Sequence, residues 1–209
     1  MNLEKINIRP CKPNDVNEAT PLMYSSGPEA FRYVFSISEK NQVLSFLSYA
    51  FQNGNGEFGY KDHFIAESNG VTLGLVGYRK SNDNLKYTVV AAKQIFSYFG
   101  FINGLKVITR GLTFEKTVPP PKKGLICLHN FAVNEESRGM GIGSKMIDFI
   151  IAKAKTDNYN GLCLDVAATN PKAKQLYLKK GFKVVSIKEA NLKNKYGTVC
   201  GHETLTLYF

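Results

Sequence analysis

The sequence predicts an α+β fold, in which helices pack against a central sheet. Two observations favour this class. Segments with alternating or short continuous apolar character, which are typical of strands, lie near both ends and in the middle of the chain. Segments with apolar residues at helical spacing lie between them. The chain has 209 residues, of which 44% are hydrophobic, so we expect a single domain over residues 1–209.

The first part of the chain is expected to form one strand and three helices. Residues 6–9 alternate as an edge or half-buried strand does. Asn14 and Asp15 can cap a short helix. Two further helices are expected at about 30–35 and 43–51, and the second of these has a clear apolar face.

A hairpin follows these helices. Residues 63–67 and 72–78 have strand character, and Asn69-Gly70 between them supplies the positive φ angles of a tight turn. The later strands are expected at 125–133, 162–168 and 204–208.

Residues 82–123, between the hairpin and the strand at 125–133, look like an insertion. Residues 89–107 are apolar and aromatic at roughly helical spacing, with Gly100 and Gly104 as expected breaks. Seven basic residues against two acidic ones give this segment a charge of +5, half of the chain's +10. We expect a basic, apolar helical insertion that packs over the main domain.

A glycine-rich turn joins the strand at 125–133 to a helix, and it carries the clearest chemistry. The turn reads Arg138-Gly139-Met140-Gly141-Ile142-Gly143. The first N–H groups of a helix lack intrahelical partners and lie at the positive end of its dipole. Glycines let successive amides approach a phosphate oxygen, and the arginine adds a charged fork. We therefore expect this turn to bind a phosphate group.

Other interpretations of the turn fit less well. A dinucleotide-binding turn has the spacing GxGxxG, whereas this one is GxGxG with no βα unit opening before it. A P-loop needs Gly-Lys-Ser/Thr, which does not follow. Glycines that served only for flexibility would each cost the helix about 1 kcal/mol relative to alanine.

The bulk properties of the chain exclude some classes of protein. No apolar stretch reaches the ~18 residues of a membrane span, and Met1–Lys5 lacks the layout of a secretory signal, so we expect a cytoplasmic protein. Four scattered cysteines without CxxC spacing favour free thiols and no metal site. The charge of +10 comes without a nucleic-acid-binding motif, so we expect no nucleic-acid partner.

Together with a second block, the glycine-rich turn resembles the GNAT superfamily of N-acetyltransferases. Arg138–Gly143 matches that family's Q/R-x-x-G-x-G/A signature, and the second block is Asn170-Pro171-Lys172-Ala173-Lys174-Gln175-Leu176-Tyr177 followed by Gly181-Phe182. Residues 17–35 and 56–63 also resemble segments of an uncharacterised bacterial subgroup. The resemblance implies an α/β/α sandwich with a mixed sheet of about seven strands, in which parallel strands 4 and 5 splay apart and the insertion lies between strands 3 and 4.

The resemblance implies acetyl-CoA as the co-substrate and a set of residues that hold it. Strand backbone groups would contact the pantetheine arm, the glycine-rich turn the pyrophosphate, and the second block the thioester end. The residues are Phe131, Ala132, Val133, Arg138, Gly139, Met140, Gly141, Ile142, Gly143, Ser144, Asn170, Ala173 and Tyr177.

The resemblance also implies direct acetyl transfer from the thioester to an amine. Tyr177 would be the general acid that protonates the departing thiolate, because a phenol near pKa ~10 keeps its proton at neutral pH. The backbone N–H of Val133, or of a neighbouring residue, would be the oxyanion donor.

The general base is less well defined by the sequence. His129 lies four residues before Val133, so on a regular strand the two side chains share a face, and an imidazole near pKa ~6.5 can accept a proton. Cys127 stands where some family members carry a second histidine or a glutamate. A purely structural role for His129 is an equal alternative, and Glu29, Glu67 and His63 are other candidate bases.

Two functions fit the sequence. The first is an acetyl-CoA-dependent N-acetyltransferase that acts on a primary amine, with a small molecule favoured over a protein. The alternative is a catalytically silent acyl-CoA-binding regulatory or sensor module of the same fold. The sequence does not decide between a monomer and a homodimer, and it does not identify the acceptor.

Overall fold

A computed structural model describes residues 6–38 and 42–209 of the chain. The segment Met1–Lys5, on which the expectation of no secretory signal rested, lies outside these residues. In the described part of the chain, the main sheet has seven strands. Their order across the sheet is β1 (Asn7–Pro10), β2 (His63–Ser68), β3 (Val71–Lys80), β4 (Leu125–Val133), β5 (Gly161–Ala167), β9 (His202–Tyr208) and β6 (Lys183–Lys188).

All neighbouring strands are antiparallel except β4 and β5, which are parallel. The mixed seven-stranded sheet is the one that the sequence analysis expected. The strand at 125–133 has the predicted bounds, and the hairpin turns at Asn69 and Gly70, which both have positive φ. Strand β6 was not predicted from the sequence, and neither was the separate two-stranded sheet of β7 (Leu192–Lys193) and β8 (Thr198–Val199).

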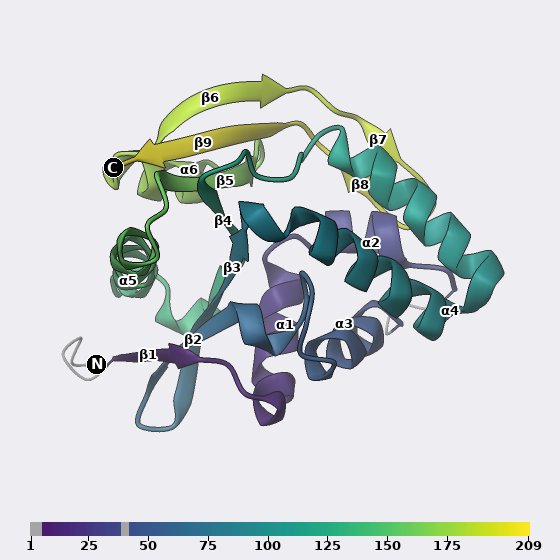
Figure 1. Ribbon diagram of the computed structural model, residues 1–209, viewed down its shortest axis with the longest axis horizontal. Helices are drawn as coiled ribbons and strands as arrows, with labels where there is room; N and C mark the ends of the chain where they lie inside the picture. Colours follow the sequence, from purple (N-terminus) through teal and green to yellow (C-terminus); the bar gives the residue numbers. More distant parts are fainter. Residues whose placement is uncertain (1–5, 39–41) are drawn as a thin grey trace.

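Helices cover both faces of the sheet, as Figure 1 shows. One face packs against α5 (Ile142–Thr156) and α6 (Pro171–Lys179), which share a core with Ile126, Leu128 and Leu164 of the sheet. Four helices pack against the opposite face and form a second core with it. These are α1 (Val16–Ser25), α2 (Pro28–Phe35), α3 (Gln42–Gln52) and α4 (Asn84–Glu115).

Helix α4 forms the insertion between β3 and β4 that the sequence analysis expected. The helical conformation is interrupted at Gly100, where φ is 71° and ψ is 177°, so α4 consists of two helical segments. The expected second break at Gly104 is wrong, because Gly104 continues the helix. A Cβ at Gly104 would lie 2.8 Å from Cδ1 of Phe96, so this glycine lets the two segments approach each other.

Sheet geometry positions the site through the divergence of β4 and β5. The two strands pair only at Leu125–Gly161, Ile126–Leu162 and Cys127–Cys163. Beyond these pairs, β4 continues to Val133 and β5 to Ala167, but the two strands no longer pair with each other. An open splay therefore lies between them. None of the helices within residues 6–38 and 42–209 has the length and apolar character needed to cross a membrane.

Candidate active site

The glycine-rich turn ends at the N-terminus of α5. Gly139 has φ 81° and Gly141 has φ 78°, a left-handed conformation that glycine adopts without strain. The first helical hydrogen bond joins the Lys145 N–H to the Gly141 carbonyl over 3.1 Å. The N–H groups of residues 142–144 therefore have no intrahelical partner, and among the described residues no side chain caps them. This helix end can receive an anion.

Gly143 lets three elements meet beside the turn. A Cβ at this position would lie 3.2 Å from Cδ2 of Leu176 in α6, and 3.6 Å from side-chain carbons of Phe131 and Val133 in β4. An added Cβ would crowd the end of the Leu176 side chain, which would have to shift by a few tenths of an ångström. The glycine at 143 therefore favours close packing, whereas those at 139 and 141 favour the left-handed backbone.

The guanidinium of Arg138 folds back onto the end of β4. Its Nε donates to the Val133 carbonyl over 3.2 Å, and Nη1 lies 3.1 Å from the carboxylate of Glu135. The side chain is 55% exposed, so this ion pair contributes little stability. Arg138 can turn toward an anion at the helix end at small cost.

The N–H group of Val133 points into the splay between β4 and β5. The Asn134 N–H donates to the Leu73 carbonyl over 2.8 Å, which makes Asn134 and Leu73 a hydrogen-bonded pair. Such pairs alternate along an antiparallel ladder, so the preceding pair, Val133 and Gly74, turns its N–H and carbonyl groups away from the partner strand. On that side β5 has already diverged.

Helix α6 closes the same end of the splay. Its N-cap Asn170 accepts a hydrogen bond from the Ala173 N–H over 3.2 Å. The Tyr177 ring is buried, with its centroid 6.3 Å from that of Phe131 and 5.9 Å from that of Phe182. Burial raises the pKa of the Tyr177 phenol above its ordinary value, so the hydroxyl stays protonated at neutral pH.

A cleft of about 320 Å³ lies on the opposite face of the sheet. Its walls are largely apolar and come from α2, both segments of α4 and residues 118–121. Its floor includes Cys127, His129 and Asn130 of β4, Asp165 of β5 and His202 of β9. The floor therefore lies where β4 and β5 begin to diverge.

The expectation that His129 and Val133 share a face of the sheet is wrong. Leu75 pairs with Ala132 and Gly77 pairs with His129, so β4 carries one extra residue, and Asn130 has φ 49°. This β-bulge reverses the alternation of side chains. Phe131 and Val133 consequently pack toward α5 and α6, whereas His129 faces the cleft.

The imidazole of His129 is a weak base in this setting. Its Nε2 lies 2.9 Å from the Glu57 carbonyl, which can only accept, so Nε2 carries the proton. Nδ1 is buried and makes no hydrogen bond of normal geometry with the described residues. Burial lowers the pKa of His129 to about 4, so the ring is neutral at pH 7.

The chain matches the acetyltransferase (GNAT) family over residues 9–182. It belongs to the GNAT acetyltransferase family. Members of this family use acetyl-CoA as the co-substrate, and the uncapped α5 N-terminus beside the open splay fits that molecule.

Solved structures show the same fold. An acetyltransferase of 20% identity has a TM-score of 0.69 and aligns over 97% of this chain and 98% of its own. An N-acetyltransferase from Staphylococcus aureus Mu50 has 17% identity, a TM-score of 0.71 and coverage of 96% and 100%. A polyamine N-acetyltransferase from Drosophila melanogaster, which forms N-acetylagmatine, has 13% identity, a TM-score of 0.58 and coverage of 98% and 100%. No curated protein matches the sequence.

The other candidate bases of this GNAT chain are engaged elsewhere. His63 is fully buried, with Nδ1 donating to the Gly59 carbonyl over 2.8 Å and Nε2 accepting from the Asn130 amide over 3.1 Å. Burial lowers the pKa of His63 to about 3. Glu29 pairs with Arg32 and accepts from the Thr198 N–H.

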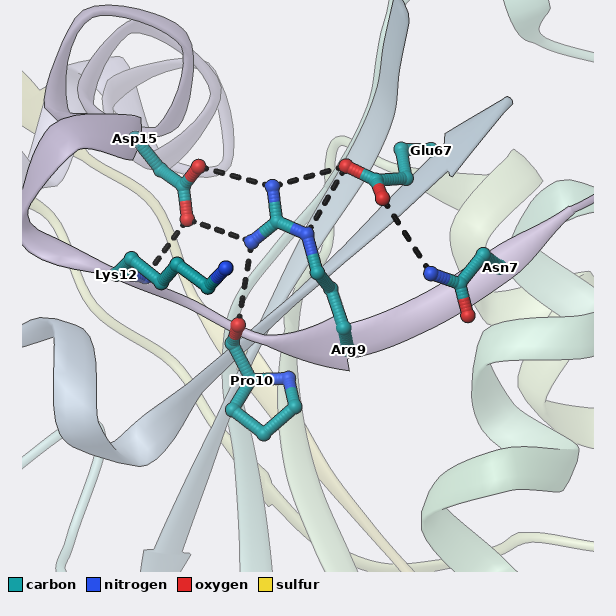
Figure 2. Close-up of polar contacts among 6 residues, drawn as sticks. All are labelled: Asn7, Arg9, Pro10, Lys12, Asp15 and Glu67. Carbon is teal, nitrogen blue, oxygen red and sulfur yellow. Dashed lines mark hydrogen bonds and ion pairs between the residues drawn. The ribbon is translucent and has the colours of Figure 1, made fainter. Parts of the chain in front are cut away.

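Glu67 lies in a polar cluster at the β1 edge of the sheet, which Figure 2 shows. The Arg9 guanidinium bridges the carboxylates of Glu67 and Asp15, each 2.8 Å away. Asn7 donates a further hydrogen bond to Glu67 over 3.3 Å. Glu67 therefore ties β1 to β2 and does not line the cleft.

Sequence reasoning did not identify four polar residues that line the cleft, which are Glu57, Arg79, Asp165 and His202. A signal for Asp165 was present, because a carboxylate inside an otherwise apolar central strand is costly unless it has a partner or a role. Glu57 and Arg79 gave no such signal. They meet as an ion pair of 3.2 Å only because the loop before β2 folds against the end of β3.

Proposed function

We propose that this GNAT chain is an acetyl-CoA-dependent N-acetyltransferase that moves an acetyl group directly from the thioester to the primary amine of a small molecule. The observation that carries the proposal is the uncapped N-terminus of α5, which opens beside the splay of β4 and β5. When bound, acetyl-CoA supplies an acetyl thioester whose carbon can form an amide bond as its bond to sulfur breaks.

The proposal assigns the two ends of the co-substrate to different groups. The amides of residues 139–144 and the guanidinium of Arg138 would hold the pyrophosphate. Backbone groups of residues 131–133, together with Asn170 and Ala173, would hold the arm that crosses the splay. The Val133 N–H, which points into the splay, would hydrogen-bond to the acetyl oxygen.

Tyr177 holds a proton at its hydroxyl oxygen and is proposed as the general acid. Its ring packs between Phe131 and Phe182, which restricts its orientation, and in this proposal the hydroxyl faces the thioester sulfur at the end of the splay. Its raised pKa keeps the proton in place until a sulfur of developing negative charge accepts it.

The insertion supports a small acceptor. Both segments of α4 and Pro119–Pro121 enclose the cleft, and a volume of about 320 Å³ is typical of a site for a small molecule. We propose that residues 1–209 act as one domain in which residues 82–123 form the roof of the acceptor site. The cleft reaches the splay at Cys127 and His129, so an amine in the cleft can approach a thioester in the splay.

Calorimetry with CoA tests the donor site. Gly141→Glu places a carboxylate where the pyrophosphate would bind, and we expect it to abolish CoA binding. Gly70→Glu is the matched control, because Gly70 has the same φ of 78° in a hairpin with no heavy atom within 4 Å of its added Cβ. If both variants bind CoA as the wild type does, the donor site is misplaced.

An amine panel with acetyl-CoA, followed by release of free thiol, tests the activity. Transfer to at least one amine is the expected result. Tight CoA binding without transfer to any amine would instead favour the silent sensor module.

A further inference from the structure

The charged groups of the cleft differ from those of the chain as a whole. The chain carries a net charge of +10, yet the charged side chains that line the cleft among the described residues are Glu57, Glu115, Asp165 and Arg79. Arg79 is neutralised by Glu57 at 3.2 Å. Of the two carboxylates that remain, Glu115 is exposed to solvent, which screens its charge, whereas Asp165 lies in the floor and gives the cleft a local preference for a cation.

Asp165 lies in the floor of the cleft, on the part of β5 that has diverged from β4. It lies two residues beyond Cys163, the last residue of β5 that pairs with β4. His129 lies two residues beyond Cys127 on the other arm, and both side chains line the cleft. Asp165 and His129 therefore flank the opening of the splay from opposite strands.

One oxygen of the Asp165 carboxylate is held by a hydrogen bond, and the other is free to bind a ligand. The Thr204 hydroxyl donates to Oδ1 over 2.5 Å from the neighbouring strand β9. The second oxygen, Oδ2, makes no hydrogen bond with the described residues. A fixed carboxylate with one free oxygen in an apolar cleft is suited to receive a single ammonium group.

The remaining walls of the cleft fit hydrocarbon. Most of its surface comes from aliphatic and aromatic side chains of α2 and α4, including Phe31, Val34, Ile95, Val107 and Leu112. A polyamine would place its second ammonium group either against these side chains, which is costly for a charged group, or near the exposed carboxylate of Glu115, which would hold it only weakly. A hydrocarbon or aromatic body would bury apolar surface there.

We propose that the acceptor is a small primary amine with an apolar body, and that Asp165 binds its ammonium group and takes up its proton. This inference rests on the function proposed above. In the proton transfer, one N–H bond of the ammonium breaks and an O–H bond forms on the Asp165 carboxylate. The amine is left neutral, with a lone pair free to attack.

Burial favours this step, because the transfer converts two charged groups into two neutral ones in an apolar site. Burial raises the pKa of Asp165 to about 6, so the residue is ionised at pH 7 and is a better proton acceptor than His129. The titratable and charged groups that act on Asp165 or line the cleft with it are Lys188 of β6, Cys127 and His129 of β4, His202 of β9, Glu115 of α4, and the paired Glu57 and Arg79. Lys188 opposes the raised pKa, and burial lowers the pKa of His202, which keeps that ring neutral.

The test compares Asp165→Asn with Glu115→Gln in the full chain. An asparagine keeps the oxygen that accepts from Thr204, so the fold is preserved, and Glu115 is an exposed carboxylate that lines the same cleft. The acceptors are hexylamine, 2-phenylethylamine, spermidine, 6-aminohexanoic acid and a short peptide with a free N-terminus. Three quantities are measured for each protein: CoA affinity, kcat/KM for each acceptor across pH, and binding of hexylamine to the protein saturated with CoA.

We expect hexylamine or 2-phenylethylamine to have a kcat/KM at least about tenfold above the other acceptors. Asp165→Asn should lower that kcat/KM by roughly 100-fold or more, weaken hexylamine binding and remove the loss of activity below about pH 6. Glu115→Gln should change kcat/KM less than about threefold, since an exposed charge interacts weakly, and both variants should bind CoA as the wild type does.

The failures of the two proposals are distinguishable. A wild-type protein that binds no CoA overturns the proposed function. A protein that binds CoA and acetylates spermidine, the amino acid or the peptide best overturns the proposed acceptor class alone. Equal effects of Asp165→Asn and Glu115→Gln on kcat/KM and on hexylamine binding overturn the role of Asp165, and the binding measurement tests that role even without turnover.

Discussion

Gly77→Ala is expected to destabilise the protein through His129. The two residues are cross-strand partners, and a Cβ at residue 77 would lie 2.4 Å from Cε1 and 2.5 Å from Nε2 of the imidazole. Carbon atoms in contact lie about 3.5–4.0 Å apart, so the ring must move by about 1 Å or more. Overpacking of this kind costs about 1–3 kcal/mol. Loss of the hydrogen bond from Nε2 to the Glu57 carbonyl adds about 1 kcal/mol, giving a decrease of roughly 2–4 kcal/mol in the free energy of unfolding.

A double-mutant cycle in urea measures this coupling. The free energy of unfolding is determined for the wild type, for each of Gly77→Ala and His129→Ala, and for the double variant. Without the imidazole there is no clash, and alanine is favoured over glycine in a strand by about 0.5–1 kcal/mol. Gly77→Ala should therefore be close to neutral or stabilising in the His129→Ala background. An equal cost in both backgrounds, within about 0.5 kcal/mol, would refute the contact as the cause.

Three further predictions concern other parts of the molecule. Tyr177→Phe should lower kcat by roughly 100-fold with CoA affinity unchanged, and an unaltered kcat in steady-state assays would exclude the general-acid role. Asn170→Ala removes the cap of α6 and should lower the free energy of unfolding by about 1 kcal/mol in urea, whereas Asn170→Ser should restore most of it. Arg9→Met should destabilise the protein at pH 7, and the difference from wild type should shrink as the pH falls from about 5. The reason is that Arg9 holds the pKa values of Asp15 and Glu67 below their ordinary values. The stability that Arg9 contributes is therefore present above the ordinary carboxyl pKa range and is lost as the two carboxylates protonate.

The glycine-rich turn and the start of α6, where we propose the donor site, could be predicted from the sequence because their signals are local. A glycine that needs positive φ, an Asn-Pro pair at a helix start and a strand that runs into a helix are each determined by neighbouring residues. The turn accordingly leads into α5 at Gly141, and Asn170 caps α6. The same local reasoning located the break at Gly100, where the backbone does leave the helix.

The cleft that we propose as the acceptor site depends on contacts between distant segments, which local patterns do not record. The cleft brings Glu57 from the loop before β2 together with Arg79 from β3, Asp165 from β5 and His202 from β9. The prediction from periodicity that His129 shares a face with Val133 was also wrong, because periodicity assumes that each residue of one strand pairs with one residue of the next. The extra residue at Asn130 has no marker in the sequence beyond being an asparagine, the type of residue that tolerates positive φ.

The bulge at Asn130 explains how one strand can contribute side chains both to the cleft and to the opposite face of the sheet, beside the proposed donor site. Before the bulge, Cys127 and His129 face the cleft; after it, Phe131 and Val133 face α5 and α6. On a regular strand all four side chains would share the cleft face, because they lie two residues apart. Phe131 would then leave Tyr177, and the packing of Gly143 against β4 would be lost. The side-chain amide of Asn130 stabilises this reversal, because it donates to the Glu57 carbonyl and to His63. The bulge is therefore held in place by hydrogen bonds on the cleft face of the sheet.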